Sequence, residues 1–449
     1  MIRIGDYFQG FASKKLAAVD INKMTSNQHE FNGAAAFKEL LGSPSEKDRY
    51  KAYFAYLTDE DEVPELFESQ LTWYDSRAKI QGRSEYRLYY PAAVDSIVQQ
   101  ARVGDTMFLA LKHDRTLLLV LAEQGSTVLR QLEWVFDSRP EENGALFVAN
   151  DMEAQPDRNE VAGEALLEML GIEVDSSDDN LMDEVARKFP GEAWPTTPVF
   201  AAFARSLVRD SDPLGAPDET LLRWVNMEHK LFRTLEKHRI SDKIGNGFMG
   251  SDGLVDVDAF LKLSLSVHNR RKSRAGLSLE QHVEALFDVH GIRYAKKAKT
   301  EGKKEPDFLF PSKAGYDDPA FPDALLTMLG SKTTLKDRWR QVLNEANRIP
   351  HKHLLTLQPG ISEDQTAEMR TENLQLVIPS ELQTQGFSSA QQSWLLSVAD
   401  FIDVIRGKER RSLAGATDQL LGPDVEFGQV ESQSTHGDRT GDVSAKDRA

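Results

Sequence analysis

Three side chains in the C-terminal half have the chemistry that metal-assisted hydrolysis of a phosphodiester requires. Asp307 lies in PDFLF, Lys332 in SKTT, and Glu345 further along the same stretch. Two carboxylates can hold a divalent cation, and a lysine beside the attacked phosphate can orient the water and stabilise the developing charge. Each residue also has an ordinary explanation: Asp307 could be a turn residue after a proline, and Lys332 a solvated lysine at the end of a strand. The chemical interpretation therefore depends on what surrounds them.

The sequence around Lys332 predicts a strand, TMLGSKT, followed by a helix, LKDRWRQVLNEANRI. Side chains two residues apart on a strand point to the same face, as Lys332 and Thr334 would. On the helix, Arg338, Gln341 and Glu345 follow an i, i+3, i+7 spacing and would share one stripe. Because the turn between these elements is short, we expect both faces to border one cleft.

Charge is distributed unevenly along the 449 residues. The whole chain has 54 Lys and Arg against 71 Asp and Glu, a net charge of −17, which disfavours a partner as acidic as DNA. The window from His268 to Lys352, however, has 17 Lys and Arg against 11 Asp and Glu. A local positive field on an acidic scaffold suits a DNA cleft, and a solvated basic surface is the alternative.

Composition also limits the other classes of function. The chain has no cysteine, which excludes disulfides and thiolate metal sites and favours a reducing cytoplasm. No segment has the long apolar run of a signal peptide or of a membrane-spanning helix. We therefore expect a soluble cytoplasmic protein that makes no contact with membranes.

The chain is long enough for two domains and a connecting region. Up to about Pro140, short apolar runs such as TMFLALKH and RTLLLVLAEQ predict mostly β structure. From Asp137 to about Pro213 the sequence is acidic and rich in proline, which predicts a linker with short helices. LLRWVNMEHKLFRTLEKHRI (221–240) has the spacing of an ordinary packing helix.

The C-terminal block alternates helix and strand signals, which predicts an α/β domain with a mixed sheet. SLEQHVEALFDVHG predicts a helix with Ser278 as its N-cap and Gly291 as its stop. Beyond about Arg411 apolar residues become scarce, which predicts a disordered tail. The predicted strands of this block are 292–295, 307–311, 327–333, 353–358 and 374–379.

The segment KDRWRQ at the start of the predicted helix has residue types that read base edges. Arginine or lysine can bind guanine in the major groove, and a carboxylate can accept from the cytosine amino group. Lys336, Asp337 and Arg338 are therefore suited to C·G pairs. Ion pairs on the surface of a helix are the commoner use of such residues.

Four segments of the C-terminal half resemble the catalytic domain of EcoRII-type restriction endonucleases, in the PD-(D/E)xK nuclease superfamily. The likeness spans roughly residues 255 to 405. It implies a restriction-endonuclease-like α/β fold, dependence on Mg²⁺, and hydrolysis that leaves 5′-phosphate ends. The segments are NRRKSRAGLSLEQHVEALF (269–287), EPDFLFP (305–311), MLGSKTTLKDRWRQVLNEANRI (328–349) and HLLTLQPGISEDQTAEMR (353–370).

The resemblance also implies roles for individual residues. Asp307 and Glu345 would hold the Mg²⁺, Lys332 would act on the attacking water, and Thr334 would support the site. Gly330 stands where the general nuclease pattern has an acid, so the second carboxylate has to come from Glu345. Further catalytic candidates are Glu284, which could equally lie on a solvated helix face, and Tyr316. The candidate DNA contacts are Arg274, Lys336, Asp337, Arg338, Arg340 and Gln341.

The N-terminal half resembles the EcoRII effector domain more faintly. SNQHEFNG (26–33) and WYDSRAKIQGRSEYRLYYP (73–91) fall where that domain, a mainly β pseudobarrel, places its DNA-contacting loops. The resemblance implies that this half binds a second copy of the DNA site and obstructs the nuclease cleft when it is unoccupied. The candidate contacts, which could also be ordinary strand-face or structural residues, are His29, Arg77, Lys79, Arg83 and Arg87.

Together these features predict a Mg²⁺-dependent type II restriction endonuclease that cuts double-stranded DNA as a homodimer. The resemblance implies a target that begins CC and ends GG. Two alternatives stay open: a nicking or methylation-dependent nuclease of the same fold, and a non-cleaving DNA-binding regulator, against which the intact acids and lysine argue. The expected division is an effector domain over 1–175, connecting helices over 176–255, a nuclease domain over 256–410 and a disordered tail over 411–449.

Overall fold

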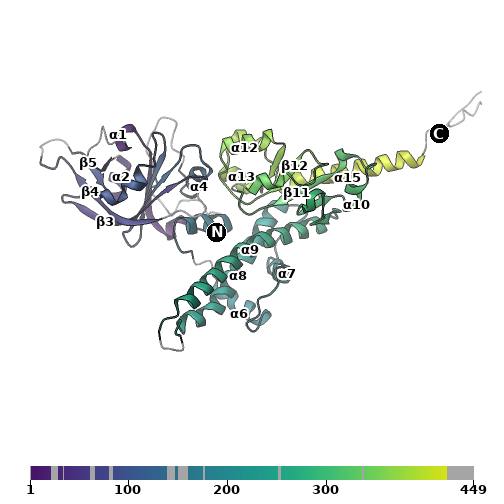
Figure 1. Cartoon of the computed structure of the whole chain (residues 1–449), viewed down its shortest axis with the longest axis horizontal. Helices are drawn as coiled ribbons and strands as arrows, with labels where there is room; N and C mark the ends of the chain where they lie inside the picture. Colours follow the sequence, from purple (N-terminus) through teal and green to yellow (C-terminus); the bar gives the residue numbers. More distant parts are fainter. Residues whose placement is uncertain are drawn as a thin grey trace, which may run out of the picture.

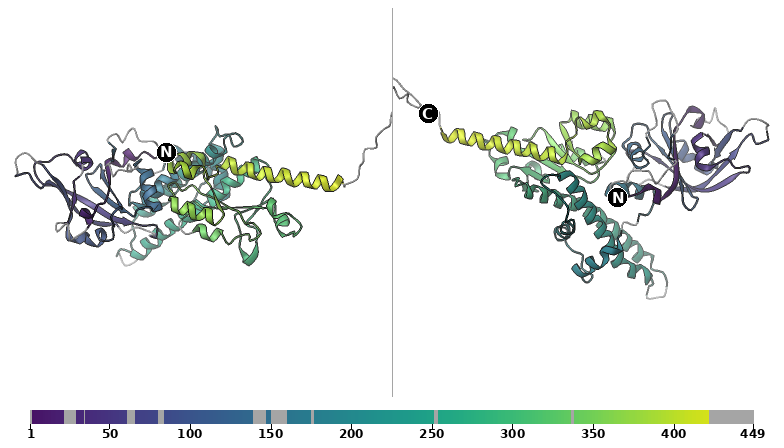
Figure 2. Two further views of the ribbon diagram at one scale, coloured as in Figure 1. Left: turned by 90° about the horizontal axis from the view of Figure 1, so that it is seen from above. Right: turned by 180° about the vertical axis from the view of Figure 1, so that it is seen from behind.

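In the computed structural model, two parts that each contain a β-sheet lie on either side of a long helical hairpin (Figure 1). Two further views show the hairpin extending away from both parts (Figure 2). None of the helices in the described part of the chain is both long and apolar enough to cross a bilayer. The structure describes residues 2–21, 29–33, 35–60, 66–79, 84–138, 147–149, 160–174, 177–250, 254–335 and 338–421.

The N-terminal part is built on one eight-stranded sheet with the order β2-β5-β4-β3-β7-β6-β1-β8. Its neighbouring strands are antiparallel except for β3 and β7, which are parallel. The prediction of a mainly β N-terminal domain is confirmed. The strands are β1 (Phe8–Lys15), β2 (Glu30–Asn32), β3 (Asp48–Leu57), β4 (Phe67–Asp75), β5 (Tyr86–Tyr89), β6 (Thr106–Lys112), β7 (Leu117–Ala122) and β8 (Phe147–Ala149).

Strands β6 and β7 are apolar on both faces because each face of the sheet is covered. Successive side chains of a strand point to opposite faces. Accordingly Phe108 and Val120 lie in one hydrophobic cluster, while Leu109 and Leu119 lie in the other. The helices of this part are α1 (Ala18–Ile21), α2 (Ala35–Leu41), α3 (Asp95–Val98), α4 (Thr127–Val135) and α5 (Glu160–Met169), and the last of these packs into the first cluster.

The predicted linker contains helices that pack on the hairpin of α8 and α9. Val185 and Phe200 contact Leu231 and Leu235 in a small apolar cluster. The prediction that a helix starts at Ser278 is wrong, because Ser278 lies deep inside α9, whose N-cap is Asp256. The helices of this region are α6 (Asp179–Lys188), α7 (Thr197–Leu207), α8 (Pro217–Gly245) and α9 (Val257–Val289).

The C-terminal part is built on a five-stranded mixed sheet with the order β13-β12-β11-β10-β9. Strands β11, β12 and β13 are parallel, and β9, β10 and β11 are antiparallel. The predicted α/β fold with a mixed sheet is confirmed. The strands are β9 (Ala295–Lys296), β10 (Phe308–Phe310), β11 (Thr327–Ser331), β12 (Lys352–Leu355) and β13 (Leu374–Val377).

The core of this part joins the sheet to three long helices. Phe287 of α9 makes edge contacts with Phe308 and Phe310 of β10, and Phe401 packs against Phe287 and Phe310. Leu221 of α8 belongs to the same cluster. The remaining helices are α10 (Lys313–Asp317), α11 (Trp339–Val342), α12 (Glu363–Thr371), α13 (Ser380–Gly386), α14 (Ser389–Gln392) and α15 (Val398–Leu421).

Two sequence predictions for this part are corrected by the structure. The helix expected over 335–349 shrinks to the single turn α11, because the chain leaves helical geometry after Val342 and Ala346 adopts a positive φ of 48°. The tail expected to be disordered from 411 is helical as far as Leu421, since α15 continues to that residue.

The N-terminal part contacts the C-terminal part through α4. The Thr127 hydroxyl donates to Gln365 Oε1 at 3.0 Å and accepts from the Ser362 amide at 3.2 Å. Gly360 has a φ of +70°, and a Cβ atom at this position would lie 2.8 Å from the carbonyl of Arg130. Only glycine therefore allows the two backbones to approach this closely.

We expect Gly360→Ala to destabilise the folded chain by about 1–3 kcal/mol, because alanine adds left-handed strain and a clash with α4. The free energy of unfolding in urea measures this. Gly125→Ala is the matched control, since Gly125 also has a positive φ of +79° but a Cβ there would meet only Asp364, at 3.9 Å. Equal losses in the two variants would contradict a tight contact at Gly360.

Candidate active site

Asp307 and Lys332 meet at one end of the C-terminal sheet. Asp307 precedes β10 and Lys332 follows β11, and these strands are antiparallel neighbours, so the start of one lies beside the end of the other. Lys332 Nζ lies 3.0 Å from Asp307 Oδ2, and the Ser331 amide donates to the same oxygen at 2.8 Å. The Asp307 carboxylate is therefore bound by a lysine and by a backbone donor.

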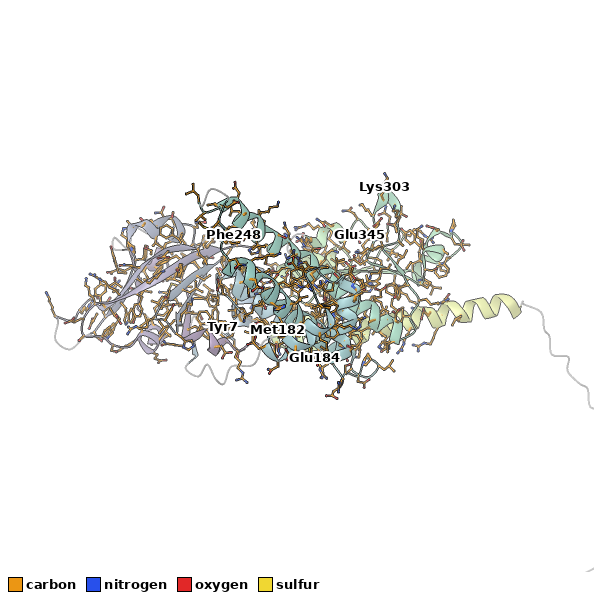
Figure 3. The ribbon with its side chains drawn as sticks, turned by 90° about the horizontal axis from the view of Figure 1, so that it is seen from below. Tyr7, Met182, Glu184, Phe248, Lys303 and Glu345 are labelled. Carbon is orange, nitrogen blue, oxygen red and sulfur yellow. The ribbon has the colours of Figure 1, made fainter. Side chains whose placement is uncertain are left out.

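Glu345 approaches this pair from the turn after α11. Its pKa is raised to about 7 by burial and by the negative charge of Asp307, against the opposing effect of Lys332. A carboxyl group whose pKa is raised by burial and by a neighbouring acid is typical of functional sites. Figure 3 labels Glu345, which lies closer to the middle of the molecule than Lys303.

The donor set fits a Mg²⁺ ion. Mg²⁺ keeps several waters and is commonly held by one or two carboxylates together with substrate phosphates. No group of three or more His, Asp or Glu side chains close enough to hold a metal occurs within the described ranges. Asp307 and Glu345 could therefore supply the two carboxylates that a phosphate-bound Mg²⁺ commonly uses.

A third acid near Asp307 was not among the sequence candidates. Glu280 of α9 is buried, and its pKa is raised by burial and by the charge of Asp307, while Lys297 binds it at 2.9 Å. The sequence did contain a signal for Glu280, because this acid lies on the apolar stripe of its helix. It has the i, i+3, i+7 spacing with Val283 and Phe287. Glu284 instead binds Lys296 at 2.6 Å and accepts from Gln281 at 3.1 Å.

Lys332 and its neighbours face a cleft of about 990 Å³ between the two parts of the molecule. Lys332, Thr334 and Arg338 line one side of it. Strand β11 ends at Ser331, so Thr334 does not share a strand face with Lys332 as expected, although both line the cleft. Arg338 is exposed and is free to reach a ligand that enters from this side.

The remaining candidate DNA contacts are not gathered on one face. Arg274 is buried, lies 3.5 Å from Glu228 and stacks between Phe200 and Phe232, so its guanidinium supports the hairpin at the wall of the cleft. Arg340 donates to Glu368 at 2.8 Å, and Gln341 is exposed on the same turn. Lys336 and Asp337 lie outside the described residues.

Tyr316 is buried and turned away from the acids of the site. Its hydroxyl donates to both carboxylate oxygens of Glu301, at 2.7 and 2.8 Å. Burial, together with this hydrogen bond, raises the pKa of Tyr316 to about 12. A phenol that keeps its proton and donates to a carboxylate cannot act as a base toward water.

The comparisons with known proteins concern the part of the chain that carries this site. Residues 232–402 match the family model described as EcoRII C terminal. This segment is similar to the EcoRII C-terminal domain. A segment of 192 residues is 48% identical to the type II restriction enzyme EcoRII of Escherichia coli, and covers 42% of this chain and 46% of that enzyme. The chain thus spans about half the length of this relative, and the expected resemblance is confirmed for the EcoRII C-terminal domain.

Two solved structures resemble the chain more distantly. Ecl18kI, in a metal-depleted complex with uncleaved, modified DNA, is 19% identical with a TM-score of 0.43, and the match covers 56% of this chain and 87% of that one. The PspGI–substrate DNA complex is 14% identical with a TM-score of 0.36, and the match covers 52% and 93%. The likeness to the EcoRII C-terminal domain rests on the sequence match.

The candidate residues of the N-terminal part are paired with acids. His29 Nδ1 lies 2.9 Å from Asp95, and Arg77 lies 2.5 Å from Glu85, which also binds Arg87. Lys79 is exposed, and Arg83 lies outside the described residues. For Arg77 and Arg87 to contact DNA, the phosphate would have to compete with the carboxylate of Glu85. Their role in DNA binding stays a prediction.

We expect Glu345→Gln to stabilise the metal-free protein above pH 7 by on the order of 2 kcal/mol, and to have little effect at pH 4.5. The folded-state pKa of Glu345 is about 7, above its unfolded value of 4.5, so folding loses stability as the pH rises through this interval and Glu345 ionises. Urea unfolding in EDTA at pH 4.5 and pH 8.5 measures the difference. A stabilisation that is the same at both pH values would contradict the raised pKa.

Proposed function

We propose that this chain is a type II restriction endonuclease that hydrolyses both strands of DNA at a specific short site with Mg²⁺ as its cofactor. The observation that supports this most directly is the convergence of Asp307, Lys332 and Glu345 at one end of the sheet in an EcoRII C-terminal domain. Two acids and a lysine beside a cleft are the groups that phosphodiester hydrolysis needs.

Each residue has a distinct task in the proposed reaction. Asp307 and Glu345 would hold the Mg²⁺, which stabilises the charge that builds up on the phosphate. Lys332 is oriented by its 3.0 Å contact with Asp307, so its ammonium would hold the attacking water and the phosphate oxygen in line. Attack of water on phosphorus breaks the bond to the 3′ oxygen, which leaves a 3′-hydroxyl and a 5′-phosphate. Thr334 would support the phosphate from the neighbouring turn.

The position of Arg338 supports a role in reading the DNA sequence. It is exposed on the same side of the cleft as Lys332. An arginine that reaches guanine in the major groove discriminates against the wrong base by about 1–3 kcal/mol. Arg338, with Lys336 and Asp337 before it, would read the C·G pairs of a target that begins CC and ends GG.

The N-terminal part would act as an effector domain that restrains the nuclease. The cleft beside Lys332 has a volume of about 990 Å³ and is bordered by both parts of the molecule. Thr127 and Gln131 of the N-terminal part line this cleft opposite Lys332 and Arg338. In this proposal DNA would reach the site after the two parts separate.

Charged contacts also hold the closed arrangement. Glu164 of α5 binds Arg233 of α8 at 3.1 Å, and Glu168 of α5 binds Arg271 of α9 at 3.3 Å. Because α5 packs in the core of the N-terminal part, these ion pairs join the effector domain to the hairpin. Binding of a second DNA site by the effector domain would then release the nuclease, with His29, Arg77, Lys79, Arg83 and Arg87 as candidate contacts.

The proposal includes a homodimer, since one chain carries one set of Asp307, Lys332 and Glu345 and two strands have to be cut. A two-fold axis would match the near-palindromic target. The enzyme would act in the cytoplasm, where foreign DNA enters. Incubation of the purified protein with plasmid and Mg²⁺ tests the whole proposal: discrete linear fragments support it, whereas nicking, methylation-dependent cutting or binding without cleavage would replace it with one of the alternatives.

Lys332→Ala should lower the rate of plasmid cutting by at least about 100-fold, because the variant loses the ammonium beside the attacked phosphate. Binding of a DNA duplex in EDTA should stay within a few-fold of the parent. Lys313→Ala is the matched control, since it removes the same charge from an exposed ion pair with Asp317. Unchanged cutting by Lys332→Ala would remove the lysine from the mechanism.

Removal of residues 1–174 should abolish the need for two DNA sites, because the contacts that close the cleft are lost. The cut is placed before α6, since a cut near residue 200 would also remove Val185 and Phe200 from their cluster with α8. The ratio of cleavage rates on plasmids with one and two sites measures the effect and should fall to about 1 in the truncated protein. A truncated protein that still prefers two sites would contradict the effector role.

A further inference from the structure

The carboxylate of Glu345 is carried by a turn that has no regular structure of its own. Helix α11 ends at Val342, Ala346 has a positive φ of 48°, and strand β12 begins only at Lys352. A non-glycine residue in left-handed geometry persists only where its surroundings fix it. The position of Glu345 therefore depends on groups outside its own segment.

The loop before Asp307 supplies two of these groups. Lys304 Nζ donates to the carbonyl of Asn344 at 3.0 Å. The carboxylate of Glu301 accepts from the amide of Asn347 at 3.3 Å. These contacts flank Glu345 on either side in the chain. The same loop continues directly to Asp307. One short stretch of backbone therefore carries one carboxylate of the site and holds the turn that carries the other.

Tyr316 and Arg348 hold this loop against the turn. The buried Tyr316 hydroxyl donates to both oxygens of Glu301 and accepts from the Arg348 amide at 3.3 Å. The Arg348 guanidinium lies over the Tyr316 ring, 5.6 Å from its centre, and donates to the Phe321 carbonyl at 2.8 Å. It also binds Asp323 at 2.6 Å. The hydroxyl of Tyr316 is thus the point at which the loop, the turn and α10 are joined.

We infer that Glu301, Tyr316 and Arg348 form a positioning clamp that sets the separation of Asp307 and Glu345 and thereby the affinity of the site for a divalent cation. The inference rests on the proposed function, in which those two carboxylates hold the metal. In this inference Tyr316 acts on the metal site indirectly, by holding Glu301 and the 343–350 turn. The Tyr316 hydroxyl does not contact the reacting atoms. Groups that orient metal ligands in this way typically change metal affinity by about 10- to 100-fold.

The first test is Tyr316→Phe, which removes one hydroxyl from a buried ring. Titration calorimetry with Mn²⁺ alone should show affinity about 10- to 100-fold weaker than in the parent. The Mg²⁺ concentration for half-maximal cutting should rise by a similar factor, while the rate at saturating Mg²⁺ stays within about 3-fold. A lost rate at saturating Mg²⁺ would overturn the inference, since the hydroxyl would then act in the reaction itself. Unchanged metal affinity would overturn it as well.

Tyr294→Phe is the matched control. Tyr294 is also packed against Phe287 and Phe308, and its hydroxyl donates to a carboxylate, that of Asp288, at 2.7 Å. It makes no bond to the 301–304 loop among the contacts of the described residues. The control should bind Mn²⁺ as the parent does. An equal loss of affinity in both variants would mean that any lost tyrosine hydroxyl loosens the domain, and would overturn the clamp.

A second pair of variants probes the same clamp from an exposed position, where folding is not at risk. Glu301→Gln keeps an oxygen that accepts from Tyr316 and Asn347, so Mn²⁺ affinity should stay within about 3-fold of the parent. Glu301→Ala removes both contacts and should reproduce the loss seen in Tyr316→Phe. Parent-like affinity in Glu301→Ala would overturn the inference. The Mn²⁺ titration does not depend on DNA cleavage, so it tests the clamp separately from the proposed function. A parent protein that binds Mn²⁺ but does not cut DNA would refute the proposed function. The affinities of the variants would still decide whether the clamp exists.

Discussion

The antiparallel pairing of β10 with β11 is the constraint on which the rest of the site depends. The register that sets Phe308 opposite Leu329 brings Asp307 level with the end of β11, where the Ser331 amide and Lys332 Nζ both reach its Oδ2 atom. Residues 25 apart in the chain thereby become hydrogen-bond partners. A one-residue slip would turn Asp307 to the opposite face of the sheet and separate it from Lys332.

The second carboxylate cannot come from β11 itself, and packing explains why. A Cβ atom at Gly330 would lie 3.2 Å from Val342 and 3.3 Å from Leu354, so this position faces the core and has no room for an acid. Val342 fills that space from α11, and the chain then turns back toward the sheet and presents Glu345 to Asp307. The absence of an acid at position 330 and the presence of one at 345 are two consequences of the same packing.

The closed arrangement of the two parts follows from a different kind of contact. A glycine allows α4 to lie directly on the 358–366 segment, and ion pairs of α5 with α8 and α9 act beside it. The pair of Glu164 with Arg233 is buried, whereas the pair of Glu168 with Arg271 is partly exposed. The contact between the two parts is thus polar, in contrast to the apolar cores on either side of it.

The sequence by itself determined the α/β class and the five strands of the C-terminal sheet, because strand periodicity is a property of short segments. The resemblance to EcoRII-type nucleases named Asp307, Lys332 and Glu345, and their roles stay a prediction. Two predictions were wrong, a helix over 335–349 and a helix N-cap at Ser278. Intrinsic helix propensity is a weak preference that tertiary packing overrides. The turn after α11 is held by contacts from other segments, and α9 begins well before Ser278. Only the tertiary structure decided that Glu280 faces Asp307 while Glu284 binds Lys296, that Arg274 is buried, and that Tyr316 holds Glu301. Those choices depend on contacts between residues far apart in the chain, which no local pattern records.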